Sequence, residues 1–469
     1  MTKQPTQNST TTRRDFLKNS GLAAIGVPLL FSPYVQRRSY SCIIIGAGLS
    51  GLAAAHALKT KKPSWNVTVL EARERTGGRV NSFRFKQNPE LVCELGAEWV
   101  GESHDRMKAL CHDFGIPLKD HRFDAWLMRD GIVKRPGQWD FSPGAKAAFE
   151  KLKQAYEGYS DKQKLRLDQY DWWTLLDEIG FSEDDLLLRD LQDSTDFGET
   201  IRMISAYAAA AEYFESSPAN EMDYKMEGGN SRLIEKLVAS LGAGSVRTGM
   251  IVQRIRQRAG RVTVTANGAD FVADACICTV PARTLDRMEF DPPLPPAHKA
   301  AAEKLQYARI IKNSVLFRER FWGPENFSLV SDVTSHYYFH STKDQPGKQG
   351  ILCSYAVGEK ADVLASQNNR RRTEIITRDL LPLEKHAPDL ALDIQSYAWQ
   401  RDKYTQGAYA FYRPGQWFTL RPILSRPHGK VLFAGEHLAD WQGFMEGAVV
   451  TGEAAAAELA GRGMRQRIS

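Results

Sequence analysis

After position 40 the chain begins with apolar runs of two different periodicities. Cys42 to Ile45 is continuously apolar, which is typical of a parallel strand buried on both faces. A helix is expected from Leu49 to Leu58, and the run NVTVLEA predicts a second strand that ends at Glu71. This part of the chain therefore predicts a strand–helix–strand unit.

Later segments show the same two patterns. Residues 226–293 begin with a Gly-Gly turn and a helix, and strand-like alternation follows in RVTVTANGADFVADACICTV. The run KVLFAGEH predicts a strand that turns at Gly435, and a final helix is expected from Gly443 onward. Residues 116–225 are helical by their periodicity and charge, whereas residues 297–428 contain several strand-like runs. The proline-rich DPPLPP at residues 291–296 predicts a linker at the exit of the 226–293 segment.

These patterns predict an α/β chain, more fully an α+β two-domain architecture with discontinuous domains. A nucleotide-binding domain of Rossmann type is expected to combine three segments, and a mixed sheet-and-helix domain is expected to hold the substrate. The expected boundaries are 1–39 for a targeting segment, 40–115, 226–293 and 429–459 for the nucleotide-binding domain, and 116–225 and 297–428 for the substrate-binding domain.

The N-terminal segment has the layout of an export signal. Arg13 and Arg14 precede a short, mostly apolar run at 21–31, which is too short to span a membrane. The stretch TRRDFLK resembles the bacterial twin-arginine signal, so export machinery of that type is an expected partner and a periplasmic or secreted location is expected. No clean small-x-small cleavage site follows, which leaves open whether the segment is removed or kept as an anchor. No later stretch is expected to span a membrane, because charges interrupt every long apolar run.

Net charge gives no indication of nucleic-acid binding. The chain has 62 basic and 56 acidic residues, a net charge of +6. Residues 1–40 hold six of the basic residues and one of the acidic ones, so the remainder is almost neutral. The six cysteines are expected to be buried thiols rather than a disulfide framework. The sequence has no Cys-x-x-Cys motif and no histidine cluster, so no metal is expected.

The glycines after the first strand predict a phosphate-binding turn. Gly46, Gly48 and Gly51 have G-x-G-x-x-G spacing between a strand and a helix. The first permits a tight turn, the second lets backbone approach a pyrophosphate, and the third lets the helix pack on the strand. Glu71 follows about 20 residues later, where an acid would bind the ribose hydroxyls. This segment therefore predicts a dinucleotide site.

A second glycine motif indicates which dinucleotide is bound. EARERTGGRV places Arg73, Gly78 and Arg79 directly after Glu71. Here the chain resembles the flavin-containing amine oxidase family, which includes monoamine and polyamine oxidases. The resemblance continues through ELGAEWVG, KMEGGNSRLIEKL, ICTVPARTL, ARIIKNSVLFRERFW, GAYAFYRPG and VLFAGEHLADWQGFMEGAVVTGE. It implies that the cofactor is FAD, whose tight binding suits an exported enzyme.

The resemblance also implies the positions that contact this cofactor. They are Gly46, Gly48, Gly51, Glu71, Arg73, Gly78, Arg79, Gly96, Ala97, Glu98, Trp99, Val252, Gly435, Glu436, Gly443 and Met445. Monoamine oxidases of animals carry the flavin on a cysteine at the position of Ala408, so noncovalent FAD is expected here.

Three residues are implied as catalytic by the same resemblance. Lys312 lies in the apolar run RIIKNSVLF, and the matching lysine of the family holds a water against flavin N5. The alternative from the sequence alone is an edge lysine with a solvated ammonium. Tyr409 and Phe444 match two positions that face each other across the flavin ring, and Phe444 replaces the more usual tyrosine. Either ring could instead belong to the core.

The substrate class follows from a departure within the superfamily. Amino-acid oxidases offer an arginine after the turn that matches GAEW, where this chain has Trp99. This favours amines without a carboxylate. Glu98, Glu102 and Glu199 could attract a cationic substrate, although each is also typical of an ordinary surface acid.

The expected function is the FAD-dependent oxidation of a primary or secondary amine, mono- or polyamine, to an imine and then an aldehyde. A hydride would pass from the substrate to flavin N5, and oxygen would then take the electrons and be reduced to hydrogen peroxide. Alternatives are an L-amino-acid oxidase of the same fold, a flavin desaturase or dehydrogenase that reduces a quinone, and a catalytically silent scaffold. A small-molecule amine and oxygen are therefore the expected partners, and a homodimer is left open.

Overall fold

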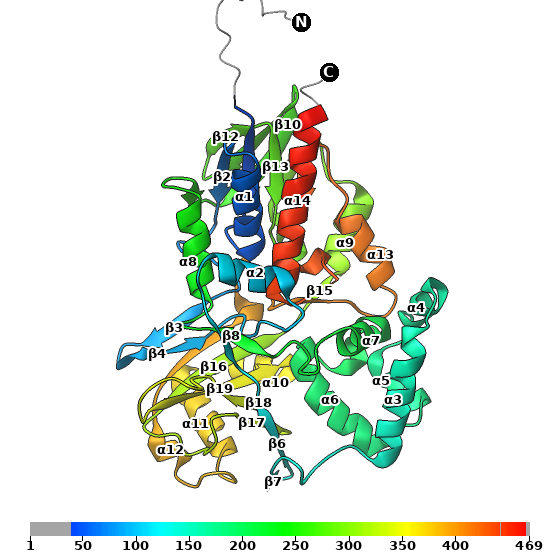
Figure 1. The fold of residues 1–469 in the computed structure, drawn as a ribbon, viewed down its shortest axis with the longest axis vertical. Coiled ribbons are helices and arrows are strands. Elements are labelled where there is room, and N and C mark those ends of the chain that lie inside the picture. Colours follow the sequence, from blue (N-terminus) through cyan, green and yellow to red (C-terminus); the bar gives the residue numbers. More distant parts are fainter. Residues whose placement is uncertain (1–38, 441, 466–469) are drawn as a thin grey trace, which may run out of the picture. The chain divides into compact units, whose positions relative to one another are not determined.

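The computed structural model describes residues 39–440 and 442–465, with side chains to residue 462. The expected export signal lies outside the described residues. The chain is a mixed helix-and-sheet protein, as the sequence predicts (Figure 1).

A five-stranded parallel sheet combines strands that are far apart in the sequence. Its order is β22-β13-β1-β2-β9. The strands are β1 (Ser41–Ile45), β2 (Asn66–Leu70), β9 (Val246–Arg247), β13 (Ala275–Cys278) and β22 (Val431–Phe433). β1 pairs with β2 and β13 on its two sides, so the expected strand–helix–strand unit forms the centre of the sheet.

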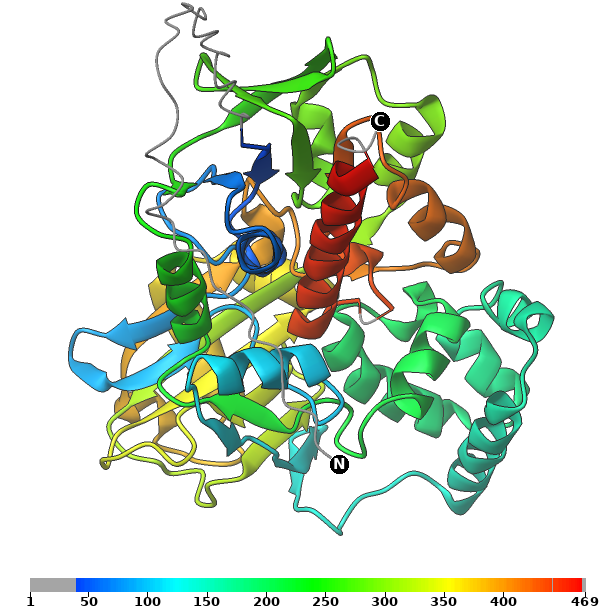
Figure 2. The same cartoon turned by 45° about the horizontal axis from the view of Figure 1, so that its top comes forward.

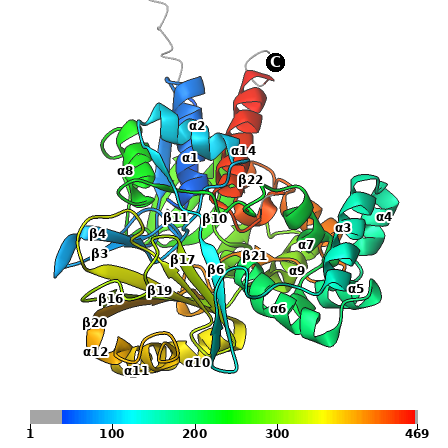
Figure 3. The ribbon, with the colours of Figure 1, turned by 60° about the horizontal axis from the view of Figure 1, so that its bottom comes forward.

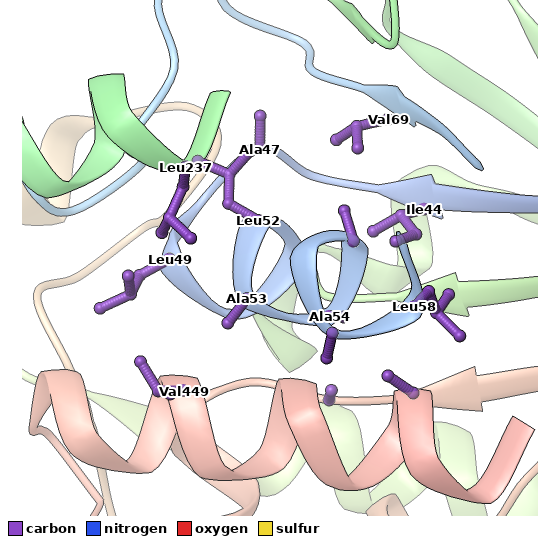
Figure 4. Packing of buried hydrophobic residues seen from close by; sticks show 14 of the residues in the cluster. Ile44, Ala47, Leu49, Leu52, Ala53, Ala54, Leu58, Val69, Leu237 and Val449 are labelled. Atoms are coloured by element: carbon purple, nitrogen blue, oxygen red, sulfur yellow. The ribbon is translucent and has the colours of Figure 1, made fainter. Parts of the chain in front are cut away.

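Helices cover one face of this sheet. They are α1 (Leu49–Lys61), α8 (Ser231–Ser240) and α14 (Met445–Arg465). Figure 4 shows Ala53 and Ala54 of α1 directed toward α14, where Val449 lies, while Leu237 of α8 approaches α1 from another side. Small side chains on α1 let the two long helices lie side by side, and α1 is seen end-on beside α14 in Figure 2.

A second sheet covers the opposite face. Its order is β12-β11-β10-β14. The strands are β10 (Val252–Arg258), β11 (Arg261–Ala266), β12 (Ala269–Ala273) and β14 (Glu289–Asp291). Ile43 and Ile45 of β1 cluster with Ile255 and Val264 of this sheet, whereas Ile44 belongs to the cluster under the helices. Since consecutive side chains of a strand point to opposite faces, burial on both sides explains the continuous apolar run of β1.

A seven-stranded sheet forms the other large β structure. Its order is β20-β16-β19-β18-β17-β6-β7. The strands are β6 (Asp124–Arg129), β7 (Ile132–Lys134), β16 (Ile310–Phe317), β17 (Phe327–Ser331), β18 (Tyr337–His340), β19 (Gly350–Val357) and β20 (Ala391–Ala398). Figure 3 shows α10 (Gly358–Ala365), α11 (Asn369–Asp379) and α12 (Ala387–Leu390) along one side of it.

Residues 143–214 are helical, and polar caps begin several of the helices. The helices are α3 (Pro143–Glu157), α4 (Asp161–Leu167), α5 (Trp172–Glu178), α6 (Glu183–Phe197) and α7 (Ala206–Phe214). Ser142, Asp171, Ser182 and Ser205 each accept a backbone N–H in the first turn of the helix that follows. The expectation that all of 116–225 is helical is wrong at its start, because β6 and β7 join the seven-stranded sheet through β17.

The remaining elements are short. They are α2 (Asp105–Asp113), α9 (Pro296–Lys304), α13 (Trp417–Leu424) and three strand pairs: β3 (Ser82–Phe85) with β4 (Asn88–Glu94), β5 (Leu118–Asp120) with β8 (Tyr224–Met226), and β15 (Gln306–Tyr307) with β21 (Ala410–Phe411). All six cysteines are buried and free, as expected. Within the described part of the chain, no helix combines the length and apolar character needed to cross a membrane.

Candidate active site

A cavity of about 410 Å³ begins at the carboxyl ends of β1 and β2 and extends to β16, α6 and α7. Ile45 and Leu70, the last residues of β1 and β2, line one part of it. Lys312 of β16 and Asp196 of α6 line another part. Carboxyl ends of parallel strands are where α/β proteins bind ligands, so this position suits the dinucleotide that the sequence predicts.

The three glycines of the first motif lie as that motif requires. Gly46 has φ +100°, a conformation that other residues rarely adopt. A Cβ atom on Gly51 would lie 2.0 Å from the carbonyl oxygen of Gly46, so only glycine lets α1 pack this closely. A Cβ on Gly48 would meet no atom within 4 Å. Gly48 therefore faces open space in the cavity, which fits a pyrophosphate approached closely by backbone.

Glu71 is held firmly at the end of β2. Its Oε2 accepts a hydrogen bond from the Ala47 N–H at 2.8 Å, and its Oε1 accepts one from the Arg73 N–H at 2.9 Å. It is buried and lines the cavity beside Val252. The Arg73 guanidinium pairs with Asp402 and lies over the Tyr404 ring at 5.0 Å. The motif predicts that the ribose binds beside these residues.

The second glycine motif is tied to the segments that follow it. Gly78 has φ +59°, and a Cβ there would lie 3.2 Å from the Gly48 Cα, so the two turns are adjacent. A Cβ on Gly96 would lie 1.9 Å from the Arg79 carbonyl oxygen, and Ala97 N–H donates to the same oxygen at 3.0 Å. All five of these residues line the cavity.

Glu436 connects three segments around the cavity. Its carboxylate accepts hydrogen bonds from the Arg79 guanidinium at 2.6 Å and from the Gly443 N–H at 2.9 Å. The same arginine donates to the Ala408 carbonyl at 2.8 Å. Gly435 and Met445 line the cavity on either side, and α14 begins there with the positive end of its dipole.

Lys312 is buried on an internal strand of the seven-stranded sheet. β16 lies between β20 and β19, and Lys312 is paired in register with Tyr355 of β19. The side chain is only 4% exposed, and its Nζ lies 2.7 Å from Glu98 Oε2. The alternative of an edge lysine with a solvated ammonium is therefore wrong.

Glu98 is the shared partner of two buried ammonium groups. Its Oε1 accepts hydrogen bonds from Lys225 Nζ at 2.9 Å and lies 3.1 Å from His121 Nε2. Burial alone would raise the pKa of Glu98, but Lys225, Lys312 and His121 outweigh it and hold that pKa well below its usual value. Burial lowers the pKa of His121 to about 4, so this ring is neutral near pH 7.

Aromatic rings surround the Lys312 ammonium. Its Nζ lies 5.4 to 5.9 Å from the ring centres of Phe339, Trp99 and Tyr355. The Tyr355 hydroxyl lies 3.1 Å from that of Tyr409, and Tyr409, Phe444 and Trp99 all line the cavity. All of the cofactor positions expected from the sequence except Gly51 thus line one cavity, together with the three expected catalytic residues.

Two of the three glutamates that the sequence leaves as surface acids are not on the surface. Glu98 and Glu199 are buried. Glu199 forms a bidentate ion pair with Arg309, whose Nε and Nη2 donate to its two carboxylate oxygens at 2.8 and 2.9 Å. Glu102 is exposed, as expected of a surface acid. Glu98 lines the cavity, but Lys312 and Lys225 neutralise its charge.

The sequence reasoning missed two cavity carboxyls, Asp196 of α6 and Glu212 of α7. A signal existed for Glu212, because it is the lone charge in the otherwise apolar helix AYAAAAEYF. Asp196 lies in the polar run DSTDFGET and gives no such signal.

The site combines a Rossmann-type phosphate-binding turn with a cavity that contains a buried lysine and aromatic side chains. This combination is typical of a dinucleotide-dependent oxidoreductase. The chain belongs to the family described as flavin containing amine oxidoreductase, whose model matches residues 49–460. This membership implies a flavin cofactor, and the open space at Gly48 and the fixed Glu71 fit one.

Two relatives with similar sequences are named L-amino-acid oxidases. An L-amino-acid oxidase of Vipera ammodytes ammodytes is 26% identical, with 89% of this chain and 92% of the relative covered. An L-amino-acid oxidase of Demansia vestigiata is 27% identical over 89% and 86%.

Solved structures of amine oxidases show the same two-domain fold. A putrescine oxidase bound to putrescine has a TM-score of 0.79 at 21% identity, covering 90% of this chain and 99% of that one. The cyclohexylamine oxidase from Brevibacterium oxydans IH-35A has a TM-score of 0.80 at 21% identity, covering 91% and 99%.

Proposed function

We propose that this protein oxidises amines that lack an α-carboxylate, using noncovalently bound FAD and oxygen. The amine becomes an imine, water hydrolyses the imine to an aldehyde and ammonia or an amine, and oxygen is reduced to hydrogen peroxide. Bound FAD would supply the redox chemistry by accepting a hydride equivalent from the carbon beside the nitrogen. The residues described below would bind and orient the substrate.

One observation carries this proposal: the part of the cavity near Lys312 has no cation free to bind a carboxylate among the described residues. The cationic residues that line the cavity are Arg73, Arg79, Arg287, Lys312 and Lys403. Lys312 is paired with Glu98, and Arg79 is paired with Glu436. Arg73, Arg287 and Lys403 lie together with Tyr404 around the expected ribose end. A substrate carboxylate would therefore be buried without a partner.

The aromatic walls support the same substrate class. An amine must be neutral for its lone pair to assist the reaction, and an alkylammonium has a pKa of about 10 in water. Apolar rings disfavour the cation and so lower this pKa. Trp99, Tyr409 and Phe444 would provide such a wall, and Lys312 would hold a water near the reacting carbon by donating from Nζ.

A second candidate, an L-amino-acid oxidase, is favoured by the names of relatives at 25 to 27% identity. A peroxide-coupled assay separates the two candidates with substrates that differ only by the carboxylate. Suitable pairs are phenethylamine with phenylalanine, pentylamine with norleucine, and 1,5-diaminopentane with lysine. We expect kcat/KM to be higher for the amine in each pair, and a consistent preference for the amino acids would overturn the proposal. Peroxide-free turnover that requires a quinone would overturn the oxygen step alone.

A further inference from the structure

The cavity has an acidic end beyond the aromatic rings. Asp196 lies in the last turn of α6, and Glu212 lies in α7, in the helical part of the chain (Figure 1). The Tyr409 hydroxyl donates to the Asp196 backbone carbonyl at 2.6 Å. The acidic end is therefore adjacent to a ring that is expected to contact the reacting part of the substrate.

Neither Asp196 nor Glu212 has a salt bridge with a cation among the described residues. Asp196 Oδ2 accepts hydrogen bonds from the Tyr213 hydroxyl at 2.7 Å and from the Asn220 amide at 3.2 Å. Asp193, one turn earlier on α6, is instead paired with Arg189 at 3.1 Å. The other acids that line the cavity are Glu71, Glu98 and Glu436, and each is bonded to backbone N–H groups or to a cation.

The raised pKa values of the carboxyls at this end indicate that they lack a positively charged partner. Burial, followed by the nearby Asp193, raises the pKa of Asp196 to about 7. Burial, Asp196 and Asp193 together raise the pKa of Glu212 well above its usual value. Two neighbouring carboxyls in a low dielectric ionise fully only when a cation joins them.

Gln442 adds an independent acceptor at the same place. It lines this cavity and also a smaller one, about 130 Å³, that Glu212 shares. Gln442 is 7% exposed, and its Oε1 is buried and has no hydrogen-bond donor among the residues that the structure describes. A buried carbonyl oxygen without a donor is uncommon in folded proteins, and an N–H group of a ligand would satisfy it.

We infer that the acidic end formed by Asp196 and Glu212 binds a second, positively charged nitrogen of the substrate. The preferred substrates would then be diamines or longer polyamines rather than monoamines. This inference rests on the proposed amine oxidation. One nitrogen of such a substrate is oxidised in neutral form beside the aromatic rings, while the other remains an ammonium and donates to the two carboxylates.

The test compares α,ω-diaminoalkanes with monoalkylamines of the same carbon number, from four to six carbons, in the wild-type enzyme. The diamine-to-monoamine ratio of kcat/KM should be roughly 10- to 100-fold in favour of the best diamine, the range for a charge-assisted hydrogen bond. Asp196→Asn and Glu212→Gln should each lower this ratio by roughly tenfold or more. Asp184→Asn is the matched control, because Asp184 is an exposed acid on the same helix that pairs with Arg129.

The outcomes distinguish the two proposals. If no amine yields peroxide, the proposed function fails. If monoamines are oxidised as well as or better than diamines, or if both variants keep the wild-type ratio, the acidic end does not bind a second nitrogen while amine oxidation still stands. The wild-type series needs no variant, so a variant that fails to retain flavin does not weaken the test.

Discussion

The buried network around Glu98 gives an ordered prediction for two substitutions. Lys312→Met removes one ammonium, but Glu98 keeps Lys225 at 2.9 Å and His121 at 3.1 Å. Glu98→Gln instead removes the only carboxylate that either Lys312 or Lys225 contacts within 4.0 Å among the described residues. Both changes keep nearly the same side-chain size.

The two substitutions should therefore differ in stability. Lys312→Met loses one charge-assisted hydrogen bond, worth about 1.5–3 kcal/mol. Glu98→Gln leaves two buried ammonium groups without a counter-ion, which costs about 3–5 kcal/mol. Denaturant unfolding of the flavin-loaded proteins at pH 7 measures both values. An equal or larger loss for Lys312→Met would refute the reasoning that Glu98 is the shared partner.

Turnover gives the second half of this prediction. Lys312→Met should lower kcat by roughly 10- to 1000-fold, the range for a positioned electrostatic group, while flavin content stays near wild type. Rapid-mixing experiments should place the loss mainly in flavin reduction or mainly in reoxidation. Lys348→Met is the control, because Lys348 is exposed and pairs with Glu319 on the surface. Normal turnover of Lys312→Met with full flavin would remove Lys312 from the active site.

The remaining predictions each use a different property of the chain. The pKa of Glu98 is lower in the folded protein than its ordinary value of about 4.5, so its ion pairs stabilise the fold above that pH, and this stabilisation is lost as the pH falls below it. Below that pH, acidification should lower the free energy of unfolding of wild type by about 1.4 kcal/mol per pH unit more than that of Glu98→Gln. Parallel pH profiles of unfolding for the two proteins would contradict this. Gly51→Ala should lower the melting temperature because its Cβ would collide with backbone, whereas Gly48→Ala should keep the melting temperature near wild type and weaken flavin retention; equal melting temperatures for the two would contradict the cradle geometry. Acid precipitation should leave the flavin in the supernatant, because Ala408 has no sulfur to hold it, and yellow pellets would show a covalent bond. Replacing Arg13 and Arg14 together by lysine should keep active enzyme in the cytoplasm, and unchanged export would show that the signal is of another type.

Local motifs were the part of the fold that the sequence predicted well. The first glycine turn depends on residues within one strand–helix unit, so Gly46 and Gly51 could be assigned their positions from spacing alone. The strands β6 and β7 were misassigned as helical because they are short, and because β6 joins the sheet by pairing with β17, about 200 residues away. Such pairing leaves little trace in local periodicity.

The site was predicted less completely for the same physical reason. Lys312 could be singled out as a lysine in an apolar run, but its partner Glu98 is 214 residues distant and was taken for a surface acid. Asp196 and Glu212 belong to helices whose surroundings only the tertiary structure reveals. Burial and pairing of charged side chains therefore had to come from the structure.

Anaerobic reduction of the bound flavin tests the central claim most directly, because it removes oxygen and peroxide detection from the experiment. The flavin-loaded protein is mixed with 1,5-diaminopentane or with lysine, which differ only by the α-carboxylate, and the loss of visible flavin absorbance is followed. We predict fast bleaching by the diamine and slow or undetectable bleaching by lysine. The reason is that, among the residues that the structure describes, no cation near Lys312 is free to bind the carboxylate. Faster bleaching by lysine would contradict the account.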